Sequence, residues 1–178
     1  MGTAKPNLPR LSPTWSITVA GIIRLVIFYG IVPWALSRVG ARYGWSEGMP
    51  SLLNILGLVI TGGGVLVLLW CTSLHINSFS KPSPIESYPP LLLVGGPYRV
   101  SRNPMYIADL AMWLGWAFFY GSIPVLLATL CFGGILALVS VPAEERQLLA
   151  RFGDEYQLYK SSVPRWIGRQ PVPRIPAA

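Results

Sequence analysis

Two strings of polar and aromatic residues stand at the edges of otherwise apolar stretches, and they carry the candidate chemistry of this chain. The first runs from Gly95 to Tyr106 and reads Gly-Gly-Pro-Tyr-Arg-Val-Ser-Arg-Asn-Pro-Met-Tyr. The second runs from Glu144 to Trp166 and contains two adjacent carboxylates, two tyrosines and a Val-Pro-Arg-Trp ending. Polar residues are costly to keep at the edges of membrane spans unless something binds them. We therefore expect the two strings to form one cofactor pocket at the membrane edge.

The segments that must position these strings are apolar enough to lie in a membrane. Of the 178 residues, 52% are hydrophobic and 12% are charged, whereas about 25% are charged in ordinary soluble domains. Four stretches approach the ~20 residues that a transmembrane helix needs. They cover residues 16–36, 52–71, 104–120 and 123–141. We expect a single all-α integral membrane domain over residues 1–178, with four transmembrane helices.

The distribution of Lys and Arg predicts the orientation of these spans. Most basic residues lie in the N-terminal segment, in the loop between the second and third spans, and in the C-terminal segment, whereas the loop between the first two spans has only Arg38 and Arg42. The positive-inside rule then places both termini and the long middle loop in the cytoplasm. Anionic lipid headgroups account for the net charge of +7. No basic residues interleave with aromatics as a nucleic-acid surface requires, so no nucleic-acid partner is expected.

The segment after Pro142 predicts an amphipathic cytoplasmic helix over about residues 143–160. Apolar and aromatic residues recur there at three- and four-residue spacing, which gives the helix one apolar face. These residues are Leu148, Leu149, Phe152, Tyr156 and Tyr159. A helix that simply lies on the membrane surface is the alternative. That alternative does not explain two adjacent carboxylates beside anionic headgroups.

The first string begins the third span in a way that favours an anionic ligand. Asn103 and Pro104 are a suitable N-cap and first helical residue. The free backbone N–H groups at such a helix start favour a carboxylate or another anion. The preceding loop is rich in proline, which holds an extended path, and its apolar Leu91–Leu93 run could form one wall of a pocket. A flexible linker is the alternative for this loop.

Together the two strings resemble one known superfamily. Gly-Pro-Tyr-Arg-x-x-Arg-Asn-Pro-x-Tyr, an apolar hairpin, and Glu-Glu-x-x-Leu-x-x-x-Phe-Gly-x-x-Tyr-x-x-Tyr-x-x-x-Val-Pro-Arg are similar to motifs of the isoprenylcysteine carboxyl methyltransferase and phospholipid methyltransferase superfamily. The resemblance is closest to the small bacterial members and covers about residues 80–166. It implies packed transmembrane helices that bind S-adenosylmethionine (SAM) at the cytoplasmic side without a Rossmann domain. The chain indeed has no Gly-x-Gly strand-to-helix fingerprint.

The resemblance also implies which residues hold SAM. Leu91–Leu93 would flank the adenine, Glu144 would accept the ribose hydroxyls or the ammonium group, and Arg102 would receive the methionine carboxylate in a charge-assisted pair. The full set of cofactor candidates is Pro90, Leu91, Leu92, Leu93, Tyr98, Asn103, Pro104, Met105, Tyr106, Glu144 and Glu145.

Methyl transfer from a sulfonium mainly requires alignment and exclusion of water. An amine or phenol acceptor would also need its proton removed, whereas a carboxylate or thiolate would not. The catalytic candidates are Arg102, Tyr106 and Asp109, the last one turn after Tyr106 on the same face of the third span. An ionisable residue inside a span is a functional candidate by default, and Arg24 in the first span is another. In the alternative reading, Asp109 and Arg24 form a structural pair across the bundle.

Some positions depart from the superfamily pattern. Many members have His where this chain has Asn103, and the prenylcysteine enzymes carry an Arg at the position of Ser140. Ser140 is therefore a candidate on the substrate side, and the missing Arg counts against a prenylcysteine acceptor. His75 is expected to be a polar interfacial residue. Cys71 and Cys131 have no metal-ligand spacing and are expected to be buried, so no metal is expected.

The sequence thus predicts a SAM-dependent methyltransferase that acts on a lipophilic acceptor from the bilayer. The acceptor atom belongs to a carboxylate, amine or thiol of a lipid or lipidated molecule. A non-catalytic membrane interaction protein that retains the fold is one alternative. A nicotinamide-dependent membrane reductase is the other, because sterol reductases have a similar helical architecture, although they are much longer than 178 residues.

Overall fold

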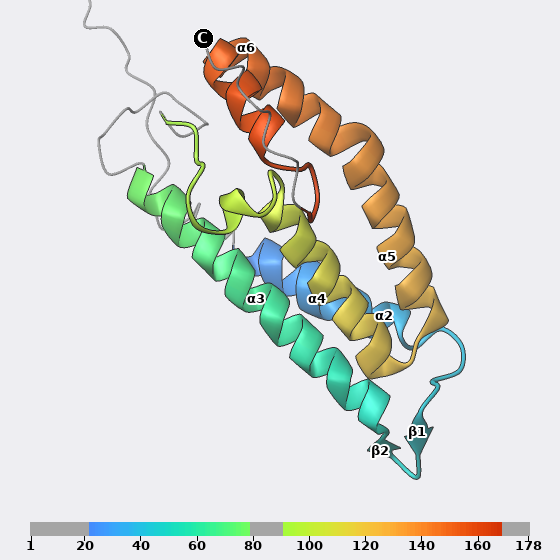
Figure 1. Ribbon diagram of the computed structural model, residues 1–178. Helices are drawn as coiled ribbons and strands as arrows, with labels where there is room; N and C mark the ends of the chain where they lie inside the picture. Colours follow the sequence, from blue (N-terminus) through green and yellow to red (C-terminus); the bar gives the residue numbers. More distant parts are fainter. Residues whose placement is uncertain (1–21, 79–90, 169–178) are drawn as a thin grey trace, which may run out of the picture.

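Helices make up most of the part of the chain that the computed structural model describes, which comprises residues 22–78 and 91–168. The elements in chain order are η1 (Ile27–Ile31), α2 (Val32–Leu36), β1 (Trp45–Ser46), β2 (Met49–Pro50), α3 (Leu52–Ser78), η2 (Gly96–Arg99), α4 (Pro104–Tyr120), α5 (Ile123–Ile135), η3 (Leu136–Ser140) and α6 (Val141–Ser162). In Figure 1, α3 and α4 lie side by side, α2 lies behind them, and α5 and α6 form a second long rod. The prediction of a mainly helical protein is confirmed.

Within residues 22–78 and 91–168, two helical segments are long and apolar enough to cross a membrane. They are Leu52–Ser78 and the continuous run Ile123–Ser162, and the first helix is described from Ile22 to Leu36. The helix α4 has the same bounds as the third predicted span, residues 104–120. The helix α3 continues for seven residues beyond residue 71, the predicted end of the second span. Thr72 and Ser73 donate hydrogen bonds to carbonyls of their own helix, which lets polar residues extend it.

Glycines allow α3 and α4 to approach closely. A Cβ atom at Gly57 would collide with the backbone of Gly115 and Phe119, and one at Gly115 would collide with Thr61. Small residues at such crossings let backbones pack directly, as is common between membrane helices. Large apolar side chains lie on the outside instead, for example Leu66 at 70% and Leu138 at 80% exposure. This distribution favours an apolar surrounding over water.

The fourth predicted span and the amphipathic helix are one continuous structure instead of two separate helices. Pro142 lacks an N–H group, and its ring would clash with the carbonyl of Leu138 in a regular helix. The π-helical turn η3 relieves this, and the Val141 N–H bonds the carbonyl of Leu136, five residues earlier. A second π-helical turn, η1, precedes Pro33 in the same way.

The break in this long helix comes later than predicted, at Gly153. This residue has φ 50° and ψ −123°, a conformation that favours glycine. The chain reverses there, and the last part of α6 returns toward the start of α4 (Figure 1). Tyr156, Tyr159 and Val163 on this returning part pack against Leu92 and Phe152. The predicted helix over residues 143–160 is therefore two pieces that face each other.

A small hairpin closes the opposite end of the bundle, and the all-α prediction did not include it. Trp45 lies opposite Pro50 in the antiparallel pair β1–β2. Glu47 and Gly48 both have positive φ, as a tight two-residue hairpin turn requires. The indole N–H of Trp45 donates to the carbonyl of Phe119 at 3.0 Å, which attaches the hairpin to the end of α4.

Candidate cofactor and acceptor site

Two adjoining cavities lie where the end of α3, the start of α4 and the two pieces of α6 meet. Their empty space, open mouths included, is about 490 Å³ and 470 Å³. Both are lined by His75, Tyr98, Arg102 and Glu144. The first cavity is otherwise lined by Leu91, Leu92, Leu93, Leu148, Phe152 and Tyr159. The second is otherwise lined by Asn103, Pro104, Met105, Tyr106 and Asp109.

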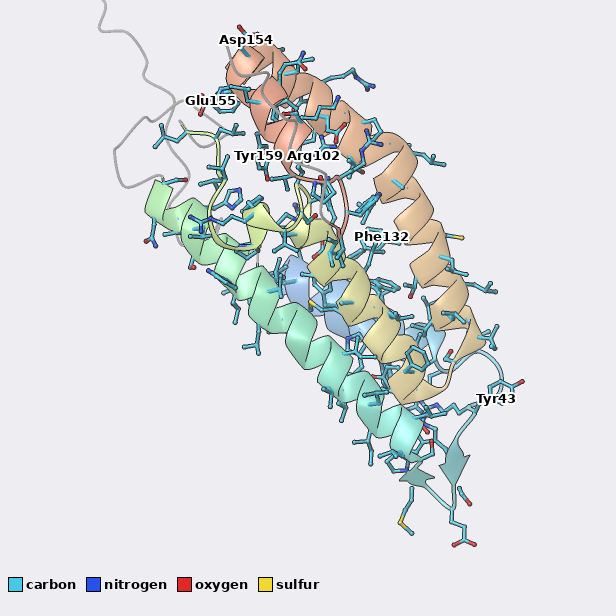
Figure 2. The ribbon with its side chains drawn as sticks, in the orientation of Figure 1. Tyr43, Arg102, Phe132, Asp154, Glu155 and Tyr159 are labelled. Carbon is cyan, nitrogen blue, oxygen red and sulfur yellow. The ribbon has the colours of Figure 1, made fainter. Side chains whose placement is uncertain are left out.

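Arg102 is the arginine that lines both cavities. Its side chain is only 7% exposed, and its Nη1 donates to Glu145 Oε1 at 2.8 Å. Its Nε is buried and has no hydrogen-bond partner within residues 22–78 and 91–168. Figure 2 shows Arg102 beside Tyr159, between the returning part of α6 and the start of α4. A buried donor of this kind is costly unless it finds an acceptor, so Arg102 is suited to bind an anion.

Glu145 holds two guanidinium groups. Arg165 donates from Nη2 to Oε2 at 2.6 Å and from Nε to Oε1 at 3.0 Å, in addition to the bond from Arg102. Burial by itself would raise the pKa of Glu145, but the hydrogen bond from Arg165 and the charges of Arg102 and Arg165 outweigh burial and lower the pKa. Glu145 is therefore ionised at neutral pH. Two positive charges on one carboxylate leave one positive charge for a further anion.

Glu144 faces the cavities, while its neighbour Glu145 does not line them. Tyr106 donates its hydroxyl hydrogen to Glu144 Oε2 at 2.9 Å, which ties the first turn of α4 to α6. In the described part of the chain, Glu144 Oε1 accepts no hydrogen bond. This oxygen is thus available to a hydroxyl or ammonium group of a ligand.

The segment after α6 fastens the loop that carries Arg102. The Arg102 N–H donates to the carbonyl of Pro164 at 3.0 Å, and the Asn103 side-chain amide donates to the carbonyl of Arg165 at 2.8 Å. Asn103 stands at the predicted N-cap position, but its side chain makes this long-range bond instead of capping α4. Pro104 is the first residue of α4, as predicted.

His75 and Tyr98 complete the wall that the two cavities share, and Tyr159 of the first cavity is hydrogen-bonded to Tyr98. Tyr159 donates its hydroxyl hydrogen to the carbonyl of Tyr98 at 2.8 Å, and the rings of His75 and Tyr98 are 5.9 Å apart. Burial raises the pKa of both Tyr98 and Tyr159, so both hydroxyls stay protonated. His75 Nδ1 lies 3.0 Å from the carbonyl of Cys71. Since a carbonyl only accepts, Nδ1 carries the hydrogen.

Asp109 lies in the second cavity, one turn beyond Tyr106, and its partner comes from the first helix. Tyr29 donates its hydroxyl hydrogen to Asp109 Oδ1 at 2.6 Å. The alternative of a structural pair between Asp109 and Arg24 is not found. Arg24 is exposed, and within residues 22–78 and 91–168 it forms no ion pair with Asp109.

Most of the predicted site residues lie together around the two cavities. Glu145 and Ser140 do not line either cavity, because Glu145 is held in the ion pairs and Ser140 lies in η3. Pro90 lies outside the described residues. Cys71 is buried as predicted, but Cys131 is exposed. No cluster of possible metal ligands occurs in the described ranges.

Several residues of this region were not predicted as site residues. They are Tyr29, His75, Leu148, Phe152, Tyr159 and Arg165. Leu148 and Phe152 were recognised only as part of an apolar helix face, whereas Tyr159 was expected to help close that helix over the cofactor; the break at Gly153 turns this face over the first cavity. The position of His75, one turn after Cys71, could have identified it as a site residue. A polar residue that extends an apolar helix can face a pocket at the membrane edge.

Comparison with known proteins agrees with this geometry. A protein of Haemophilus influenzae that is described as uncharacterized is 33% identical over 63 residues, which cover 35% of this chain and 100% of that protein. No solved structure matches the chain. The family model described as phospholipid methyltransferase matches residues 52–155. This match begins earlier than the expected residues 80–166 and therefore includes α3. Because it spans more than half of the 178 residues and both sides of the cavity pair, the chain belongs to the phospholipid methyltransferase family.

Proposed function

We propose that this protein is a SAM-dependent methyltransferase that acts on a lipophilic amine. The observation that carries the proposal is the buried Arg102, which borders both cavities and has an unpartnered Nε. The family is one of methyltransferases, and an anion-binding arginine between an apolar cavity and an acidic cavity suits a cofactor that has an adenosine end and a carboxylate end.

The residues present fit SAM. Leu91, Leu92 and Phe152 offer an apolar wall to the adenine, and Glu144 Oε1 can accept hydrogen bonds from the ribose hydroxyls. Arg102 Nε and the start of α4 would hold the methionine carboxylate, since both favour an anion.

When bound, SAM supplies an electrophilic methyl group on a positively charged sulfur. The protein has to align the acceptor with this group and keep water away. Tyr98 and Tyr159, joined by their hydrogen bond, and the α6 residue Leu148 close the first cavity. Asp109 lines the second cavity, where an acceptor from the bilayer would bind.

The charges of the second cavity favour an amine over a carboxylate as the acceptor. Asp109 and Glu144 are acidic, and among the described lining residues Arg102 is the only Lys or Arg. The Arg102 charge is shared with Glu145 and with the proposed cofactor carboxylate. An ammonium group would be attracted by Asp109, to which it can give up a proton.

The proposed site also implies a membrane topology. We propose one domain over residues 1–178, in which four helices cross a prokaryotic plasma membrane and both termini lie in the cytoplasm. The exposed apolar surfaces of α3 and α5 support spans there, and the basic residues of α6 support its place at the cytoplasmic headgroups.

Calorimetric titration of S-adenosylhomocysteine into the protein in lipid nanodiscs tests the cofactor assignment. We expect micromolar binding that Glu144→Gln weakens on the order of 10-fold or more, because a charged acceptor of hydrogen bonds is lost. The matched control is Glu155→Gln, a carboxylate that is exposed on the returning part of α6 (Figure 2). Equal affinity of all three proteins would overturn the pocket assignment.

The same titration separates the alternatives. A well-folded protein that binds neither S-adenosylhomocysteine nor NADPH would be a membrane interaction protein. Preferential binding of NADPH would indicate a reductase. The family match and the anion-binding Arg102 beside an acidic cavity both favour methyl transfer.

A further inference from the structure

The first helix lies outside the family match of residues 52–155, and its Tyr29 hydroxyl contacts Asp109, a residue that lines the second cavity. We infer that Tyr29 is a positioning residue that fixes Asp109 for the acceptor amine. This inference rests on the proposed function, because Asp109 is the residue there that contacts the acceptor. It assigns the first helix a role in acceptor recognition.

The hydrogen bond from Tyr29 makes the two carboxylate oxygens of Asp109 inequivalent. Oδ1 accepts from the Tyr29 hydroxyl at 2.6 Å, a short contact of the kind that charge-assisted bonds make. Within the described ranges, Oδ2 has no hydrogen-bond partner. The carboxylate therefore cannot rotate freely, and one defined oxygen remains for a ligand in the second cavity.

Aromatic packing holds Tyr29 in this place. The Phe28 ring meets the Tyr29 ring edge-on at 4.9 Å, and it also packs at 5.1 Å from Trp113 and 5.3 Å from Phe132. Trp113 is one turn beyond Asp109 on α4. The first helix is thus fixed to α4 and α5 by the same cluster that orients the tyrosine.

The sequence explains why Tyr29 sits in an irregular turn. Pro33 has no N–H group for the carbonyl of Tyr29, four residues earlier, so the helix widens into η1 around Tyr29. Such π-helical turns occur frequently at functional sites. Pro33 itself is buried, so the turn is part of the packed bundle.

The proposed step is a proton transfer that balances without further reactants. A long-chain ammonium group, R–NH₃⁺, gives one proton to Asp109 Oδ2, and the products are R–NH₂ and the neutral carboxylic acid. The amine then has its lone pair free for methylation. Tyr29 keeps its own proton throughout and only maintains the direction of the carboxylate.

A single NMR signal can report on this arrangement. The chain has only two aspartates, so Asp154→Asn leaves Asp109 as the one site labelled by [4-¹³C]aspartate in cell-free synthesis. In this background, Tyr29→Phe removes one hydroxyl. The matched control is Tyr120→Phe, which removes a hydroxyl that makes no hydrogen bond to the described residues, at the other end of α4. Dodecylamine and dodecanol, added to nanodisc samples, serve as a cationic and a neutral probe.

We expect Tyr29→Phe to shift the Asp109 signal and Tyr120→Phe to leave it in place. Dodecylamine, but not dodecanol, should shift the signal, and the amine affinity should fall about 10-fold in Tyr29→Phe, in line with the loss of a hydrogen bond to a charged group. An unmoved signal, or amine affinity that is equal or higher in Tyr29→Phe, would overturn the inference. Binding of S-adenosylhomocysteine, measured on the same samples, should not change in Tyr29→Phe. If the protein without the Tyr29→Phe substitution does not bind S-adenosylhomocysteine, the proposed function is overturned, together with the inference that rests on it.

Discussion

Glu144 and Glu145 are neighbours in the chain, yet they do different work. Consecutive residues on a helix point about 100° apart, so one carboxylate borders the cavities and the other meets Arg102 and Arg165. Glu145 holds the Arg102 side chain at the wall of both cavities, beside Glu144. Adjacent acidic residues at a membrane edge are thus explained by one ligand-facing and one structural role.

The structural role of Glu145 predicts a pH dependence of stability. Its pKa in the folded protein lies below the ordinary value of 4.5, so its ionised form stabilises the fold at neutral pH. This contribution is present above pH 4.5 and is lost as the pH falls through the lower folded-state pKa. Glu145→Gln should destabilise the protein by about 3 kcal/mol at pH 7, because it breaks a buried ion pair. It should also flatten the acid decline in thermal stability in detergent. A parallel decline in Glu145→Gln and in Glu155→Gln would contradict this.

The planar guanidinium group of Arg102 predicts that a positive charge alone is insufficient for cofactor binding at this position. Arg102→Lys retains a positive charge for Glu145 but loses the planar set of donors that includes Nε. We expect S-adenosylhomocysteine affinity to fall on the order of 10-fold, since one charge-assisted hydrogen bond is lost. Calorimetry with Arg99→Lys, an exposed arginine three residues earlier, is the matched control. Unchanged affinity in Arg102→Lys would place the ligand carboxylate elsewhere.

At the scale of the elements, α6 closes the site because the chain reverses direction at Gly153, within this helix. The reversal at Gly153 brings Tyr156, Tyr159 and Val163 over Leu92 and Phe152. The chain then continues to Pro164 and Arg165, whose carbonyls accept hydrogen bonds from the Arg102 loop. The returning part of α6 and this segment thus cover the first cavity and fasten its arginine.

This closure predicts a specific effect of a methyl group at Gly153. Gly153→Ala has to adopt positive φ with ψ −123°, which costs about 1 to 3 kcal/mol for residues other than glycine. We expect lower thermal stability and weaker binding of S-adenosylhomocysteine, as the returning part of α6 detaches. Gly62→Ala is the control, because a Cβ there meets open space within a regular helix. Equal binding by Gly153→Ala and Gly62→Ala would show that the reversal does not close the site.

The elements near the site show what the sequence could and could not predict. The bounds of α4 followed from Pro104 and from the glycine after Tyr120, which are local signals. The polar strings of the site were recognisable as well, because local composition alone marks them. The bond between Tyr29 and Asp109 joins residues 80 positions apart, and no periodicity predicts such a contact. Pro142 looked like a helix start because the sequence does not reveal that a π-helical turn will accommodate it.

At the scale of the whole molecule, the two ends of the bundle have different chemistry. One end carries both cavities and the ion pairs of Arg102. The other end carries the hairpin, where Arg38 and Arg42 stack on Trp34, Trp45 and Tyr120. Aromatic residues are typical of membrane interfaces. The cavity at the hairpin end is lined by no charged residue among those described, so the proposed cofactor and acceptor would meet at the end that carries Arg102.

This asymmetry predicts the labelling pattern of cysteines placed at the two ends. In a background of Cys71→Ala and Cys131→Ser, which removes both native cysteines, Glu47→Cys lies in the turn of the hairpin and Asp154→Cys lies beside Gly153. The proposed topology puts the hairpin outside the cell membrane and α6 in the cytoplasm. A membrane-impermeant maleimide should therefore label Glu47→Cys in intact spheroplasts, and should label Asp154→Cys only after lysis. Labelling of both positions before lysis would mean that the two ends face the same compartment, and the four-span topology would be wrong. The reverse pattern would retain the spans but would open the cavities to the outside, where a cytoplasmic cofactor could not reach Arg102.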